Sequence, residues 1–253
     1  MSAVGHPGVP RRPPRPLRLI RRFPRRGRGA WFGLAIEVIA PLLAAATRWR
    51  ISGREHLPRQ GGVLVASNHL SFADPIAVTL FTLVAGRVPR FFAKAELWET
   101  PVVRRVMRSG GHIAVHRGRA SALDAFRDGV AAARAGECVV VFPEGGFTER
   151  PGQWPDRGKT GLARMALTTG VPVVPLACWG TQELLPVGSR LPRVRPRPTL
   201  HLVAGPPVDL SDLVGGRPSA SQLREATERI MAAITELLSH ARGQDPPTVA
   251  EGA

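Results

Sequence analysis

The sequence predicts an α/β fold: a mixed, largely parallel central sheet covered by helices, preceded by an N-terminal membrane-interface helix. Three observations lead to this prediction. Short apolar, β-prone runs alternate with helical patterns along most of the chain, as right-handed crossover connections require. Polar residues directly follow several predicted strands, which is typical of the carboxyl edge of such sheets. An apolar stretch near the N terminus is flanked by arginines and tryptophans.

Length and composition are those of one domain with a basic surface. The 253 residues can bury a sizeable core, and the formal net charge is +16. The basic residues are arginines apart from two lysines, Lys94 and Lys159. Because an ammonium and a guanidinium fork are not interchangeable, both lysine positions are of interest. Cys138 and Cys178 lie in apolar runs, which predicts buried free thiols in a reducing compartment.

Residues 1–28 are rich in Pro and Arg, and we expect a disordered basic tail. Such a tail can attach to anionic lipid, with about 1 kcal/mol per basic residue near the surface. Nucleic acid is the competing partner, and a membrane-tethered nucleic-acid-binding protein is the alternative of another class. Phe23 is the tail's one aromatic residue, which disfavours base stacking, so no nucleic acid is expected.

Residues 29–50 are predicted to form a membrane-associating helix. Its apolar part would reach about 27 Å, short of a comfortable span, and Glu37 and Pro41 weaken the spanning interpretation further. Trp31 and Trp49 near the two ends, with arginines on both flanks, fit a helix that lies in the interface. We therefore expect a peripheral or monotopic protein at the cytoplasmic face of the cell membrane. An ordinary buried core helix is the alternative.

The α/β domain is predicted over residues 51–242, with a disordered tail over 243–253. The apolar runs place strands at 62–66, 89–93, 110–117, 137–142, 171–178 and 199–204. The helical patterns place helices at 74–84, 96–108, 121–134, 158–169 and 223–240. Two prolines interrupt the run at 171–178, which predicts an edge strand or a bulged one.

The turn between the strand at 62–66 and the helix at 74–84 carries the first candidate site. His69 and Asp74 lie five residues apart there, and the Asp74-Pro75 pair signals a helix start. On a turn, the carboxylate can fold back to accept the imidazole N–H and leave the other ring nitrogen as a general base. A substrate hydroxyl would then be the nucleophile. The alternative is that His69 is a polar turn residue satisfied by its neighbours.

Other polar residues are predicted to reach the same edge of the sheet. Lys94, Arg117 and Glu144 each follow a predicted strand, as His69 does, and the carboxyl ends of parallel strands meet. His, Cys and acidic residues never cluster at ligand spacing, so no metal site is predicted. A hydrolase is disfavoured because no Gly-x-Ser-x-Gly elbow is present.

Four motifs in order resemble the glycerolipid acyltransferase family, and most closely its 1-acylglycerol-3-phosphate acyltransferase branch of actinobacterial type. The motifs are Asn68-His69-x4-Asp74, Gly111-x5-Arg117-Gly118, Phe142-Pro143-Glu144-Gly145 and Val171-Pro172-Val173-Val174-Pro175. The resemblance implies transfer of an acyl group from acyl-CoA or acyl carrier protein to the sn-2 hydroxyl of 1-acylglycerol-3-phosphate, without a cofactor. Glycerol-3-phosphate, a lysophospholipid or a glycolipid is the alternative acceptor.

The resemblance also implies roles for individual residues. His69 matches the general base and Asp74 its partner, with Asn68 beside them in the substrate site. The remaining positions, matched to acceptor or phosphate binding, are Lys94, Arg117, Glu144 and Gly145.

One position departs from the family pattern. The third motif usually reads Phe-Pro-Glu-Gly-Thr-Arg-Ser, whereas here Phe147 stands at the place of the phosphate-binding arginine. Arg150 or Lys159 can replace that arginine, or the acceptor has a different head group.

Overall fold

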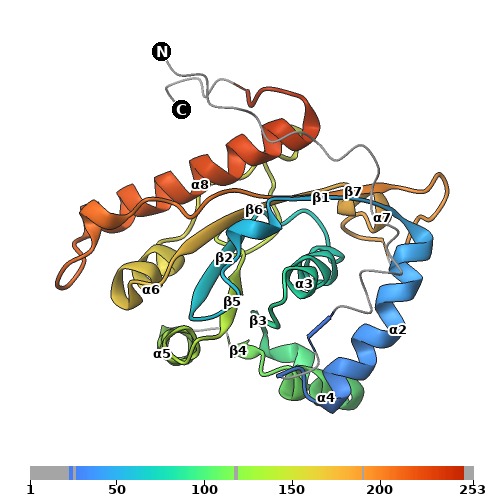
Figure 1. Cartoon of the computed structure of the whole chain (residues 1–253), viewed down its shortest axis with the longest axis horizontal. Helices are drawn as coiled ribbons and strands as arrows, with labels where there is room; N and C mark the ends of the chain where they lie inside the picture. The colour runs from blue at the N-terminus through green and yellow to red at the C-terminus, as the bar shows by residue number, and fades with distance from the viewer. Residues whose placement is uncertain (1–22, 25–26, 117–118, 190, 248–253) are drawn as a thin grey trace.

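A seven-stranded sheet forms the centre of the protein in this computed structural model, which describes residues 23–24, 27–116, 119–189 and 191–247 (Figure 1). The strand order is β1-β7-β6-β2-β5-β3-β4, and only β6 and β7 pair antiparallel among these strands. The mixed, largely parallel sheet is therefore confirmed. The strands are β1 (Arg48–Ser52), β2 (Val63–Ser67), β3 (Pro89–Lys94), β4 (Ile113–Val115), β5 (Cys138–Val141), β6 (Val173–Trp179) and β7 (Thr199–Ala204).

Helices cover both faces of this sheet. Figure 1 shows α2, α3 and α4 on one side and α5, α6 and α8 on the other. The α-helices are α2 (Ala30–Ala46), α3 (Asp74–Val84), α4 (Pro101–Ser109), α5 (Arg119–Arg134), α6 (Gly161–Thr169), α7 (Thr181–Leu184) and α8 (Ala220–Arg242). Short 3₁₀ helices are η1 (Arg54–His56), η2 (Ala95–Trp98), η3 (Pro151–Gln153) and η4 (Ser211–Leu213).

Strand β2 shows why the sequence folds in three layers. Val63 and Val65 pack into the core on the α3 side, while Leu64 and Ala66 pack against α6 and α8 on the other. All four side chains are fully buried. A strand that is covered on both faces consists of consecutive apolar residues, and residues 63–66 form such a run in the sequence.

Strand β6 is neither an edge strand nor a bulged one, so that prediction was wrong. It pairs with β2 on one side and β7 on the other. The antiparallel ladder to β7 begins at Leu176, one residue after Pro175. Pro175 therefore lies at the end of this ladder, where its carbonyl accepts a hydrogen bond from the Gly205 N–H at 3.0 Å and no N–H is needed.

The predicted N-terminal helix is shorter than expected, because α2 ends at Ala46 and Arg48–Ser52 forms β1. The Thr47 hydroxyl donates a hydrogen bond to the Leu43 carbonyl at 2.6 Å and so caps the end of the helix. Trp49 is buried and donates its indole N–H to the Thr47 hydroxyl, so it does not anchor the helix at an interface. Across the described residues, we find no helix with the length and apolar character needed to span a membrane.

Two further differences concern the chain between and beyond these elements. The helix predicted at 96–108 is divided into η2 and α4, since Thr100, which precedes Pro101, adopts an extended backbone. The tail predicted at 1–28 lies mostly outside the described residues, as do residues 248–253 of the tail predicted at 243–253.

Candidate functional site

The candidate site lies where β2, β5 and β6 end at the same edge of the sheet. His69 follows β2, Glu144 follows β5, and Thr181 follows β6. Because these three strands are parallel neighbours, their carboxyl ends place the following turns side by side. The segments are far apart in the sequence, and the sheet brings them together.

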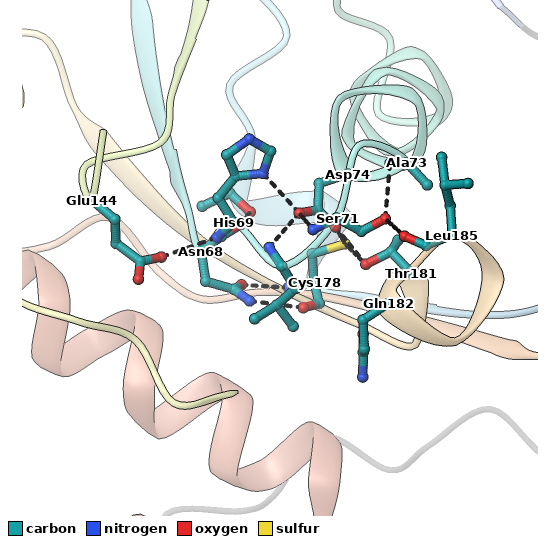
Figure 2. Close-up of polar contacts among 12 residues, drawn as sticks. Asn68, His69, Ser71, Ala73, Asp74, Glu144, Cys178, Thr181, Gln182 and Leu185 are labelled. Carbon is teal, nitrogen blue, oxygen red and sulfur yellow. Dashed lines mark hydrogen bonds and ion pairs between the residues drawn. The ribbon is translucent and has the colours of Figure 1, made fainter. Parts of the chain in front are cut away.

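The structure pairs His69 with Asp74 across the turn that precedes α3. His69 Nδ1 lies 2.8 Å from Asp74 Oδ2, and the same oxygen accepts the backbone N–H groups of Leu70 at 2.5 Å and Ser71 at 2.7 Å. Asp74 is the first residue of α3 and folds back into the turn instead of capping the helix. A carboxylate that accepts at Nδ1 fixes that nitrogen as the protonated one, so Nε2, which points away from Asp74, is the free base (Figure 2).

Asp74 is fully buried, and its second oxygen is also occupied. The Thr181 hydroxyl donates to Oδ1, and the Cys178 thiol lies 3.6 Å from the same atom (Figure 2). Burial, together with the nearby Asp74 charge, raises the pKa of Cys178 well above its usual value, so the thiol keeps its proton and can donate. Burying a carboxylate is unfavourable unless donors surround it, and here donors reach both oxygens.

Aromatic rings hold the imidazole from two sides. The ring of Phe142 stacks on His69 with centroids 4.2 Å apart, and the ring of Phe147 lies tilted at 4.4 Å. Phe72 packs edge-on against Phe147 at 4.7 Å. The His69 side chain keeps 17% of its surface exposed. The rings therefore restrict the imidazole while leaving part of it accessible.

The loop after β5 brackets the main chain of His69. Glu144 Oε1 accepts the His69 N–H at 3.0 Å, and the Thr148 N–H donates to the His69 carbonyl at 2.9 Å. The other oxygen of Glu144 accepts the Asp156 N–H at 2.9 Å. Burial raises the pKa of Glu144, although these hydrogen bonds oppose the rise. Glu144 thus braces the turn through backbone groups.

Asn68 is placed differently from the expectation of a substrate-binding residue. It is fully buried, its amide nitrogen donates to the Cys178 carbonyl at 2.9 Å, and its amide oxygen accepts the Cys178 N–H at 2.8 Å. Both polar ends of this side chain therefore join the turn after β2 to β6.

The predicted cationic residues have different surroundings. Lys94 ends β3 and is exposed. Arg117 lies outside the described residues. Arg150 donates to the Pro155 carbonyl at 3.4 Å, within its own loop. Gly145 is exposed and has φ +70°, a conformation that glycine adopts without strain.

Comparison with known proteins identifies the family. The model of the family described as Acyltransferase matches residues 48–179, about half of the 253 residues. The chain belongs to the Acyltransferase family. The resemblance to an acyltransferase family drawn from the four motifs is thereby confirmed, while the actinobacterial type of branch stays a prediction.

Relatives within this family have named activities. The chain is 32% identical over 142 residues to a chloroplast 1-acyl-sn-glycerol-3-phosphate acyltransferase of Brassica napus, covering 55% of this chain and 39% of that protein. It is 30% identical over 134 residues to a 1-acyl-sn-glycerol-3-phosphate acyltransferase of Borreliella burgdorferi, covering 53% and 52%. The chain thus spans about two fifths to one half of the length of these curated relatives.

A solved acyltransferase structure is similar over a larger share of the chain. The crystal structure of the 1-acyl-sn-glycerophosphate acyltransferase PlsC from Thermotoga maritima aligns with a TM-score of 0.62 and 25% identity. The alignment covers 83% of this chain and 76% of that one. The acyltransferase fold expected from the sequence is therefore confirmed.

Three residues around the acyltransferase motifs were missed by sequence reasoning as parts of the site. Thr181 was not singled out, Phe142 was named only as part of the third motif, and Cys178 was expected only to be a buried thiol, which it is. Thr181 comes two residues after the end of β6, as His69 does after β2, so the strand-end rule that selected His69 applies to it equally. The stacking of Phe142 on His69 depends on the β2–β5 pairing, for which the sequence carries no local signal.

Proposed function

We propose that this chain transfers a fatty acyl group from acyl-CoA or acyl carrier protein to the sn-2 hydroxyl of 1-acylglycerol-3-phosphate, giving phosphatidic acid. The observation that carries the proposal is the His69–Asp74 pair at the carboxyl edge of the sheet in a member of the Acyltransferase family. The named activities of the relatives from Brassica napus and Borreliella burgdorferi support this choice of acceptor.

In the proposed reaction, His69 Nε2 removes the proton of the acceptor hydroxyl as its oxygen attacks the thioester carbonyl. The C–O bond forms, the tetrahedral intermediate collapses, the C–S bond breaks, and the thiolate takes the proton back from the imidazolium. A positioned base typically contributes about 10²–10⁴-fold. Asp74 stabilises the imidazolium and holds the productive tautomer, and the rings of Phe142 and Phe147 keep the imidazole in place.

We further propose that α2 lies in a membrane surface with the protein peripheral or monotopic at the cytoplasmic face. Apolar side chains on its outer side are exposed: Trp31 45%, Leu34 54%, Val38 54%, Ile39 39% and Leu42 65%. The neighbouring α4 exposes Arg104, Arg105 and Arg108. The Arg105 guanidinium lies 5.3 Å from the ring centroid of Trp31, so cationic and apolar groups meet there. This combination fits an anionic bilayer surface, where the lipid acceptor resides.

Phe147 favours a second candidate, in which the acceptor is a lysophospholipid with a different head group or a glycolipid. Its ring packs on His69 at the position where the family pattern has a phosphate-binding arginine. An apolar ring cannot bind phosphate, so either another cation does so or the head group differs.

An acceptor panel tests the function directly. Purified protein in detergent is given one acyl-CoA and each acceptor in turn, and free thiol release is followed. We expect the highest kcat/KM with 1-acylglycerol-3-phosphate. A panel in which this acceptor is no better than water would refute the proposed function.

Replacing the base tests the assignment of His69. We expect His69→Ala to lower transfer by about 10²–10⁴-fold, because the hydroxyl then loses its positioned base. Exposed His240, in the last turn of α8, provides the matched control His240→Ala, which should retain full activity. Thermal unfolding checks that both variants fold, and near wild-type transfer by a folded His69→Ala protein would eliminate this role.

A further inference from the structure

Lys159 has a defined place beside the turn that carries Glu144. Its backbone N–H donates to the Pro143 carbonyl at 2.8 Å, while its side chain is exposed. The stem of this side chain runs over Gly145: an ideal Cβ at Gly145 would lie 2.6 Å from Lys159 Nζ and 2.9 Å from Cδ. The space that a side chain at position 145 would occupy is therefore filled by Lys159.

This position puts the ammonium on the loop that contacts the main chain of the proposed base. The residue before Gly145 is Glu144, whose carboxylate holds the His69 N–H, and Thr148 on the same loop holds the His69 carbonyl. The loop under the Lys159 ammonium is thus the one that brackets His69. A phosphate bound by Lys159 would lie beside the turn at which the acceptor hydroxyl must be placed.

Neither of the other two candidate positions on this loop offers an equivalent free charge. Phe147 presents an aromatic ring, which packs against His69 and Phe72. The Arg150 guanidinium is directed into its own loop, at the Pro155 carbonyl. Lys159 combines an exposed ammonium with a stem held against the turn.

We propose that Lys159 binds the phosphate of the acceptor and takes over the role of the arginine that Phe147 replaces. The inference rests on the proposed function, since it assigns the acceptor's phosphate to a residue of that site. An ammonium is a compact point charge with three donors, which suits a phosphate monoester approached from one side. Acyl-CoA also carries phosphate, so the test separates the two substrates.

The test compares two acceptors that differ only in the phosphate: 1-acylglycerol-3-phosphate and the 1-acylglycerol with the same chain. Hydrogen bonds to charged groups are worth about tenfold or more in affinity. We expect Lys159→Gln to raise the KM for the phosphorylated acceptor by about tenfold or more, with little change for 1-acylglycerol or acyl-CoA. Lys159→Arg, which keeps the charge, should retain most of the affinity.

Arg164→Gln is the matched control, because it removes an exposed cation from α6, the helix that follows Lys159, and is expected to leave the KM for the phosphorylated acceptor unchanged. A Lys159→Gln protein with an unchanged KM for that acceptor, an equal rise for both acceptors, or a rise confined to acyl-CoA would overturn the assignment. The outcome is separable from the proposed function, because wild-type protein that fails to acylate 1-acylglycerol-3-phosphate refutes the function itself.

Discussion

At the scale of single residues, the site depends on one buried carboxylate with donors from two distant segments. One oxygen of Asp74 accepts hydrogen bonds from the His69 ring and from two backbone N–H groups of its own turn. The other oxygen accepts hydrogen bonds from the Thr181 hydroxyl and the Cys178 thiol, which lie more than a hundred residues away along the chain. The orientation of the proposed base is therefore set partly by the end of β6.

Thr181 tests this dependence. We expect Thr181→Val, which keeps the shape and removes the donor, to lower kcat about tenfold at nearly constant KM, because Asp74 loses a hydrogen bond to its charged form. Thr181→Ser keeps the hydroxyl and should recover most of the rate. Steady-state kinetics of both variants, with thermal unfolding as a check, measure the effect. A Thr181→Val protein with wild-type kcat, or a larger loss in Thr181→Ser than in Thr181→Val, would show that the methyl group matters and the hydroxyl does not.

At the scale of elements, the sequence predicted best what is encoded locally. The β2–turn–α3 unit has its signals in consecutive residues, and α3 spans Asp74–Val84 as expected. The edge assignment of β6 failed because the antiparallel partner β7 lies beyond a loop and decides what Pro175 must satisfy. Trp49 is buried in β1, which pairs with β7. This pairing is also non-local, so the sequence around Trp49 did not indicate it, and the residue was assigned to the N-terminal helix instead.

The same division applies to the candidate site. The His69–Asp74 pairing was predictable, since both residues and their turn are contiguous. The buried role of Asn68 was not, because its partner is the backbone of Cys178 in another strand. Aromatic contacts to His69 likewise require the sheet to be assembled first.

His112 connects α2 to the sheet and gives this contact a pH dependence. Its Nδ1 accepts the Phe91 N–H at 3.2 Å, and Phe32 of α2 packs edge-on against its ring at 4.8 Å. Burial, with the nearby Arg90 charge, lowers the pKa of His112 from 6.5 to about 4. The unfolded chain therefore binds this proton more readily, so the stabilisation is complete above pH 6.5 and is lost as the pH falls towards 4.

His112→Asn keeps an acceptor near the Nδ1 position and cannot titrate. We expect the stability difference between wild type and this variant to shrink by about 3 kcal/mol as the pH falls through that range. Denaturant unfolding at several pH values measures it, and the comparison with the variant removes the contribution of other titrating groups. Parallel curves for the two proteins would show that His112 carries none of the acid sensitivity.

At the scale of the whole molecule, the proposed function requires a water-exposed sheet edge and a lipid-facing surface on one protein. Helix α2, which exposes apolar side chains, and helix α4, which exposes arginines, lie on the same side of the sheet (Figure 1). Leu123 is also exposed, and it belongs to α5, which lies on the opposite side of the sheet (Figure 1). The membrane proposal can therefore be tested by replacing exposed apolar residues with glutamate, either on α2 or on α5.

We expect Val38→Glu with Leu42→Glu to weaken binding to vesicles of phosphatidylglycerol and phosphatidylcholine by about tenfold or more, because two apolar side chains no longer transfer into the bilayer. Both positions are more than half exposed, at 54% and 65%, so the fold and the melting temperature should be unaffected. Leu123→Glu, at a position 57% exposed, is the control and should bind as wild type does. Sedimentation with vesicles measures the binding. If the control loses as much binding as the α2 variant, attachment does not occur through α2; if neither loses any, another surface holds the protein on the membrane.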